Sequence, residues 1–272
     1  MRQKFVRSSL LIVSAAIGSG FGFPAGLRAQ DAPYTKDRPR GEWDVTLGAG
    51  AAVRPTYEGS DHYIASPVPF VNVIWRDTIS LGVDGLSAYW RYENLRIGGG
   101  LTYGTGRQQS SGIFQQGDGR LAGMGDIPAA FALKGFADYK LGPVVLNASL
   151  TKFTANGNDG VLANFGIGLP YKLTETTTVR ASVSANWADQ NYMQTYFGVT
   201  PTQAINSGFS QFNAGAGIKD VNFGVGLAQQ LGPHWALVAN ARLIRLTGDA
   251  ENSPIVFSKT QALFMSAITY HF

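Results

Sequence analysis

The chain has 272 residues, of which 44% are hydrophobic and only 15% are charged, and it contains 34 glycines and no cysteine. The lack of cysteine excludes a disulfide scaffold, a thiolate zinc site, an iron–sulfur cluster and a cysteine nucleophile. Four of the 22 basic residues and none of the 18 acidic residues lie in the first 29 positions. The rest of the chain is therefore formally neutral, and nucleic acid is not expected as a partner.

Residues 1–29 are predicted to be a secretory signal peptide. Three basic residues precede an apolar stretch, small residues follow, and cleavage is expected after Ala29. A retained N-terminal anchor helix is the alternative, which the glycines and the proline between positions 18 and 26 disfavour. We expect an exported protein with a periplasmic N-terminal segment over 30–41 and its folded domain over 42–272.

From Trp43 onward the hydrophobicity alternates with a period of two, which is typical of a strand with one apolar face. No stretch of comparable length shows a helical period. Twelve strands are predicted, over residues 42–54, 65–76, 78–83, 86–92, 95–104, 128–139, 143–153, 161–171, 177–188, 214–230, 234–246 and 261–272.

The connections between these strands alternate in length. Every second one is a tight turn, whereas the others include long loops over 55–64, 107–127, 189–213 and 247–260. Short turns at one end and long loops at the other are typical of outer-membrane barrels. We therefore predict an all-β protein, a transmembrane antiparallel up-and-down β-barrel of about 12 strands in a Gram-negative outer membrane. An exported soluble β-sandwich is the alternative.

The last predicted strand ends in an aromatic residue, Phe272, and Tyr270, Ile268 and Phe264 share its face. A terminal phenylalanine on an alternating last strand resembles the signal that the barrel assembly machinery of Gram-negative bacteria reads. Tyr270 and Phe272 are thus the predicted assembly signal. The expected partners are this machinery and the lipid of the outer membrane.

Four segments of the chain resemble the family of MltA-interacting protein (MipA) and OmpV, outer-membrane proteins of proteobacteria. They are PTYEGSD at 55–61, GMGDI at 123–127, YFGVTP at 196–201 and GDAENSPIV at 248–256. Their order and spacing, with the terminal YHF, fit the family over about residues 41–272. The resemblance implies a non-enzymatic barrel that contacts a membrane-bound lytic transglycosylase and a penicillin-binding protein and coordinates murein growth.

These segments lie in or beside the predicted external loops, where binding residues tend to concentrate. Tyr57, Tyr196, Phe197 and Asp249 are therefore candidates for recognition of a ligand, a host or an antibiotic. The alternative is structural: the two aromatic residues at 196–197 could pin the longest loop over the mouth of the barrel, and Asp249 could accept hydrogen bonds within its own turn.

A search for catalytic motifs finds none. His62 is the one histidine predicted on the external side, and Ser60, Asp61 and Ser66 lie near it in the sequence, but such neighbours in a loop are usually surface residues. The chain has no P-loop and no dinucleotide fingerprint, and residues 156–160 lack the spacing of an EF-hand. We expect no enzymatic activity, no cofactor and no metal site.

The inward face of the predicted barrel carries charges of both signs. These are Asp44, Arg54, Arg96, Lys134, Asp138, Arg180 and Arg242. In a barrel of this size they either pair across the lumen and plug it or line a water-filled path. Three functions stay open: a scaffold for murein enzymes, a narrow channel for small solutes, and a surface recognition or adhesion barrel.

Overall fold

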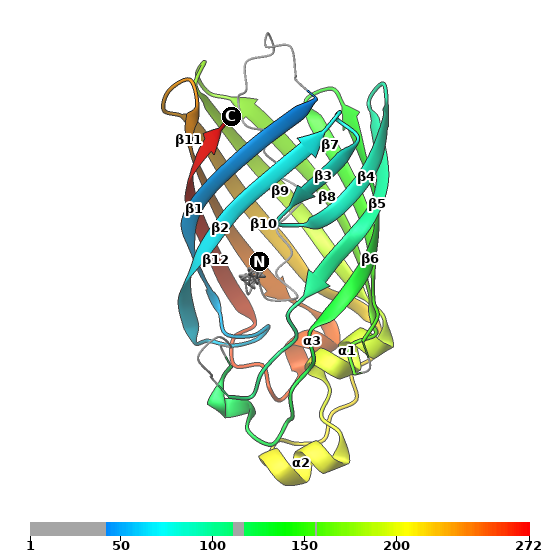
Figure 1. Cartoon of the computed structure of the whole chain (residues 1–272). Coiled ribbons are helices and arrows are strands. Elements are labelled where there is room, and N and C mark those ends of the chain that lie inside the picture. Colours follow the sequence, from blue (N-terminus) through cyan, green and yellow to red (C-terminus); the bar gives the residue numbers. More distant parts are fainter. Residues whose placement is uncertain (1–41, 111–116, 156) are drawn as a thin grey trace, which may run out of the picture.

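The computed structural model describes residues 42–110, 117–155 and 157–272, which form a closed barrel of antiparallel strands (Figure 1). Each strand pairs with its sequence neighbours, and β1 closes the barrel against β12. The strands are β1 Trp43–Pro55, β2 Tyr63–Trp75, β3 Ile79–Gly82, β4 Gly85–Tyr92, β5 Leu95–Gly104, β6 Ala130–Leu141, β7 Val144–Phe153, β8 Val161–Lys172, β9 Thr177–Ala188, β10 Gly217–Gln230, β11 Trp235–Leu246 and β12 Thr260–His271. The predicted signal peptide, 1–29, and the segment 30–41 lie outside the described residues.

The predicted architecture is confirmed in strand number, order and closure. Each predicted strand overlaps an observed one, and the largest difference in a bound is three residues, at the start of β10, predicted at position 214 and observed at Gly217. The agreement follows from the period of two, because side chains alternate between the two faces of a strand.

The two faces of the wall differ in polarity as the alternation predicts. In β1, Leu47 and Val53 are exposed on the outside, whereas Thr46 and Ala52 are buried inside. The outward side chains form an apolar band that includes Leu81, Ile97, Leu101, Leu133, Leu150, Phe165, Ile167, Val183, Phe223, Val225, Leu243, Phe264 and Ile268. A closed barrel with an apolar exterior suits hydrocarbon, because its backbone polar groups pair within the wall. The chain is therefore a membrane barrel.

Aromatic side chains mark the short-turn end of the band. Trp43 lies 6.2 Å from Trp75 between ring centroids, and Trp235 lies 4.9 Å from Tyr270. Rings at this level are typical of the interface between lipid and water. Since short turns are periplasmic in such barrels, the opposite, long-loop end is the external one.

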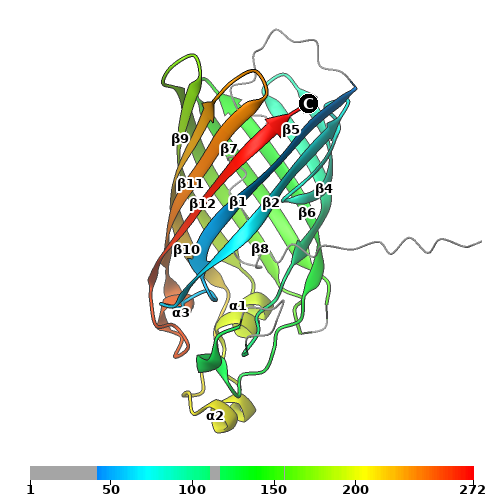
Figure 2. The same cartoon turned by 60° about the vertical axis from the view of Figure 1, so that its left-hand side comes forward.

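Three short α-helices lie at the long-loop end, α1 Gln190–Phe197, α2 Pro201–Ser207 and α3 Gly248–Asn252 (Figures 1 and 2). The sequence analysis did not predict these helices. Helices of this length span about two turns or fewer, so they show no sustained period.

Local capping explains why these helices form. The Asp189 side chain accepts a hydrogen bond from the Tyr192 N–H at the start of α1, and Thr200 forms a capping box with Gln203 ahead of Pro201 at the start of α2. Among the residues that the structure describes, no helix has the length and apolar composition needed to cross a membrane.

Candidate functional site at the long-loop mouth

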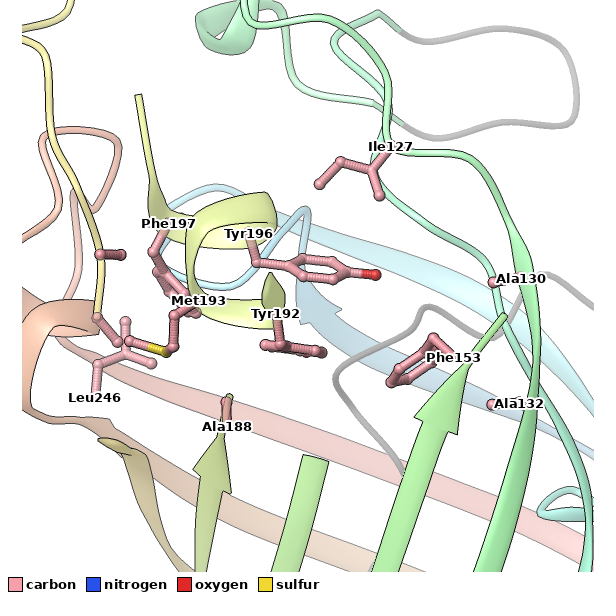
Figure 3. Close-up of a cluster of buried hydrophobic side chains, with 12 residues drawn as sticks. Ile127, Ala130, Ala132, Phe153, Ala188, Tyr192, Met193, Tyr196, Phe197 and Leu246 are labelled. Carbon is pink, nitrogen blue, oxygen red and sulfur yellow. The ribbon is translucent and has the colours of Figure 1, made fainter. Parts of the chain in front are cut away.

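Helix α1 lies across the external mouth and packs against strands from different parts of the circumference. Tyr192, Met193 and Phe197 are fully buried, and the Tyr192 ring stacks on Tyr196 at 4.4 Å and lies 5.9 Å from Phe153 at the end of β7 (Figure 3). Ile127, Ala130, Ala132, Ala188, Ala214, Leu246 and Ala250 complete this cluster. Burying each large side chain contributes about 1.5–3 kcal/mol, so α1 is a fixed plug.

Hydrogen bonds tie the plug to loops that are distant in the sequence. The Tyr57 hydroxyl donates to the Ile255 carbonyl at 3.0 Å, and Arg107 Nη1 donates to the Tyr196 carbonyl at 2.7 Å. Burial lowers the pKa of Arg107 to about 10, and the guanidinium remains charged at neutral pH. These bonds join loops that follow β1, β5, β9 and β11.

A buried ion cluster lies beneath the plug. Lys219 Nζ is 2.8 Å from Glu58 Oε1 and 2.5 Å from Asp220 Oδ2, and all three side chains are buried. Lys219 and Asp220 both point inward because β10 has a register shift between Ile218 and Asp220. The cluster joins the loop after β1 to strand β10, three strands away around the closed barrel.

A chain of asparagine side chains leads from this cluster across the inner wall. Asn147 donates to Asn164 at 3.0 Å, Asn164 donates to Asn186 at 2.8 Å, and Asn186 donates to Asp220 at 2.7 Å. The four residues lie on β7, β8, β9 and β10, so the cluster is continuous with the polar lining of the lumen.

Two polar atoms beside the ion cluster have no hydrogen-bond partner in the described part of the chain. They are Glu58 Oε2 and the Tyr192 hydroxyl, both buried. Burial raises the pKa of the Glu58 carboxyl, against the opposing effect of Lys219. The positive charge of Lys219 is therefore what makes buried carboxylates tolerable here.

A second polar cluster fastens the loop after β1 to the loop after β5. Asp118 Oδ2 accepts hydrogen bonds from Thr56 Oγ1 at 2.8 Å and from Ser60 Oγ at 3.2 Å, and it pairs with Arg120, which also contacts Asp61. Burial raises the pKa of Asp118, but the hydrogen bonds from Arg120 and Thr56 outweigh it and hold that pKa well below its usual range.

The arrangement around His62 does not match a catalytic triad. His62 Nδ1 lies 3.4 Å from Asp118 Oδ2, but the Ser60 hydroxyl donates to the same carboxylate instead of to the imidazole. A triad requires the serine to donate to the histidine ring. In the described ranges, no three His, Cys, Asp or Glu residues lie together in a way that could hold a metal ion.

The candidate recognition residues lie in different environments. Tyr57, Tyr196 and Phe197 are buried within the plug, where they hold loops together and do not reach the external solvent. Asp249 is exposed, and its Oδ2 accepts a hydrogen bond from the Gly215 N–H at 2.7 Å. For the two aromatic residues at 196–197, this burial is the arrangement that the structural alternative describes.

The seven candidate lumen residues, Asp44, Arg54, Arg96, Lys134, Asp138, Arg180 and Arg242, lie at inward positions of the wall and are buried or half-buried. Arg96 Nε donates to Asp138 Oδ2 at 2.9 Å, and the guanidinium lies over the rings of Tyr89 and Phe136. Arg96 on β5 and Asp138 on β6 thus form an ion pair between neighbouring strands. Lys134 forms no ion pair with a described carboxylate.

The predicted assembly signal lies at the periplasmic end of β12. Phe272 is 67% exposed, its backbone N–H donates to the Val45 carbonyl at 3.0 Å, and its ring contacts the edge of Tyr270. Deletion of Phe272 is expected to lower the amount of folded barrel in the outer membrane, because the exposed ring is lost while the β1–β12 pairing stays possible. Heat-modifiable migration on gels measures this amount. Phe257→Ala, in an external loop, is the control, and wild-type levels of the deleted protein would contradict the assignment.

Similar solved structures include OmpT of Vibrio cholerae (8% identity, TM-score 0.38, 86% of this chain and 99% of that chain), OpdK of Pseudomonas aeruginosa with vanillate (13%, 0.33, 76% and 52%) and OmpF of Salmonella typhi with daunomycin (12%, 0.36, 85% and 97%). At such low sequence identities and TM-scores, the ligands of those proteins give no information about the ligands of this chain. No curated protein matches. The family model described as MltA-interacting protein MipA matches residues 47–272, and the chain belongs to this family.

Proposed function

We propose that this barrel is a non-enzymatic scaffold of the Gram-negative outer membrane that holds a murein lytic transglycosylase at its periplasmic face. The observation that carries the proposal is the packing of α1 across the external mouth above the ion cluster of Glu58, Lys219 and Asp220, which makes the periplasmic end the face we assign to partners. The family description, which names an interaction with MltA, supports the same direction.

The periplasmic turns offer polar contacts for such a partner. Exposed ion pairs join Glu42 to Arg76 at 2.5 Å and Lys172 to Glu175 at 2.6 Å. Exposed pairs of this kind contribute little to folding stability, so their groups can exchange partners. A penicillin-binding protein, which the resemblance also implies, is a further proposed partner. We also propose that the signal peptide directs export of the chain and that the barrel assembly machinery inserts it into the outer membrane.

Chemical crosslinking in intact cells, followed by purification of the barrel, is the direct test. A lytic transglycosylase is expected to copurify, and charge reversal at Arg76 and Lys172 is expected to lower its yield more than charge reversal at the external residue Lys259. Absence of any murein enzyme after crosslinking would contradict the scaffold.

The narrow channel is the competing function, and the closed mouth gives it less support. We expect the wild-type barrel to show no steady conductance in planar bilayers, because the plug is buried and hydrogen-bonded from several sides. Regular single-channel steps from the folded wild-type protein would favour the channel over the scaffold.

A further inference from the structure

The wall of the barrel is incomplete on the external side of the β3–β4 hairpin, in the half where the long loops lie (Figure 1). β2 pairs with β1 over residues 63–75 but with β3 only over 72–75, so residues 63–71 have no strand on their other side. β5 pairs with β6 as far as Gly104 but with β4 only as far as Leu101. Three strand spacings separate β2 from β5, or about 14 Å. We call this gap the notch.

Two prolines adapt the free edge of β2 to this position. Successive residues of a strand direct their backbone groups to opposite neighbours, and the pairing of β2 with β1 continues through Pro67 and Pro69. The two residues therefore direct their backbone toward the notch, where a proline leaves no N–H without a partner. An unpaired N–H in hydrocarbon would cost several kcal/mol. Proline at these two positions therefore suits a strand edge that has no neighbouring strand.

A small cavity of about 60 Å³ lies directly behind the hairpin. Asn72, Ser80 and Lys134 line it from the inward faces of β2, β3 and β6, and Val83 lies in the hairpin turn. Val71 also lines it, although this side chain is 38% exposed on the outer face. The cavity is therefore lined both from the inward face of the wall and by the strand β2 at its free edge.

The polar groups of the cavity favour a ligand with negatively charged oxygens. The Asn72 side-chain nitrogen is buried and has no hydrogen-bond partner within the described ranges. Lys134 has no carboxylate partner there either, whereas the nearby Arg96 is neutralised by Asp138. Asp84, in the hairpin turn, is the one carboxylate among the lining residues. An amide N–H and an ammonium group together suit a phosphate or a carboxylate.

We infer that the notch is a lateral portal that takes a single-chain amphiphile with a phosphate or carboxylate head group from the surrounding lipid. The head group occupies the cavity beside Lys134 and Asn72, and the acyl chain passes Val71 and lies along the free edge of β2. A cavity of this size holds one head group. Because α1 packs across the mouth, the portal offers the amphiphile a path to the lumen that does not pass the plug. This inference is independent of the scaffold role.

The chain has no cysteine, so single labels test the portal cleanly. A bimane fluorophore is attached at Ser80→Cys, beside the cavity, or at Ser184→Cys on the inward face of β9, and each barrel is placed in nanodiscs. Added 5-doxyl stearate, a carboxylate with one chain, is expected to quench position 80 saturably and position 184 weakly. Dodecyl phosphate is expected to relieve the quenching, and dodecyl maltoside is not.

Charge variants separate the portal from general binding of acyl chains. With the label at position 80, Lys134→Met is expected to weaken the apparent affinity about tenfold, the loss of one charge-assisted hydrogen bond. Lys152→Met, which removes an exposed lysine of the neighbouring strand β7, is expected to leave it unchanged. Asp84→Asn is expected to leave it unchanged or to tighten it. Lys134→Gln replaces the first variant if heat-modifiable migration shows that Lys134→Met does not fold.

Three results would overturn the portal. Equal quenching at positions 80 and 184 would show that chains partition without a site, and equal losses in Lys134→Met and Lys152→Met would show that surface charge governs binding. Efficient disulfide dimers of a Val71→Cys barrel that lacks the fluorophore would show that a second copy of the chain, and not an amphiphile, covers the free edge.

Discussion

Replacing Lys219 by methionine is expected to destabilise the barrel by about 3–5 kcal/mol, because it leaves the carboxylates of Glu58 and Asp220 buried without their shared cation. The plug is expected to loosen at the same time, since the cluster joins Glu58, in the loop after β1, to Lys219 on β10. Urea unfolding in detergent micelles measures the stability, and conductance in planar bilayers measures the opening of the mouth.

Two comparisons isolate the effect of the buried charge. Lys152→Met removes an exposed lysine and is expected to change stability by no more than about 0.5 kcal/mol. A triple variant, Glu58→Gln with Lys219→Met and Asp220→Asn, is expected to recover much of the loss, because no uncompensated charge remains. A Lys219→Met barrel as stable and as tightly closed as the wild type would show that the cluster does not hold the plug.

Arginine on the lipid face is expected to be nearly as damaging. Val183 lies near the middle of β9 with 47% of its side chain exposed on the outside, whereas Arg180 on the same strand is 8% exposed and faces the lumen. Val183→Arg is expected to cost about 2–4 kcal/mol, the range for arginine at the bilayer midplane of such barrels. Arg180→Ser is expected to cost less, because lumen positions tolerate substitution.

The neighbouring pair on β11 repeats the test in a second strand. Leu237→Arg places a charge on the lipid side, and Arg242→Ser removes one from the lumen side. The amount of each folded variant in the outer membrane, measured by heat-modifiable migration, gives the ranking. If the serine variants were lost and the arginine variants retained, the two faces of the wall would be reversed, since a slip of one residue exchanges them.

The barrel could be predicted from the sequence because its signals are local. Alternation along each strand and the length of each connection can be read within a few residues, and both follow from the geometry of a wall with one side in lipid. The ion cluster could not be predicted in this way. The bulge between Ile218 and Asp220 breaks the period of two, so strict alternation would place Lys219 and Asp220 on opposite faces.

The contacts between side chains within the plug could not be predicted from the sequence either. Glu58 and Lys219 are 161 positions apart, and no local pattern links them. The aromatic residues Tyr57 and Tyr196 drew attention as exposed binding groups, yet their size and apolar rings suit the packed interior of the plug equally well. One signal was present and not used. Pro67 and Pro69 inside a predicted strand indicate an edge without a neighbour, and the notch is where that edge lies.

The closure of β1 against β12 sets the order of events during biogenesis. The bond from Tyr57 to Ile255 joins residues 198 positions apart, and the register from Thr46 with His271 to Val53 with Phe264 joins the two ends of the fold. Contacts of such sequence separation form late, because the entropy of closing the chain must be overcome before they contribute. The chain therefore passes through a stage in which β1 and β12 are not yet paired and its external loops are loose. Loops without their final contacts are preferred sites of proteolysis, so fast closure of the barrel shortens the interval in which they are exposed.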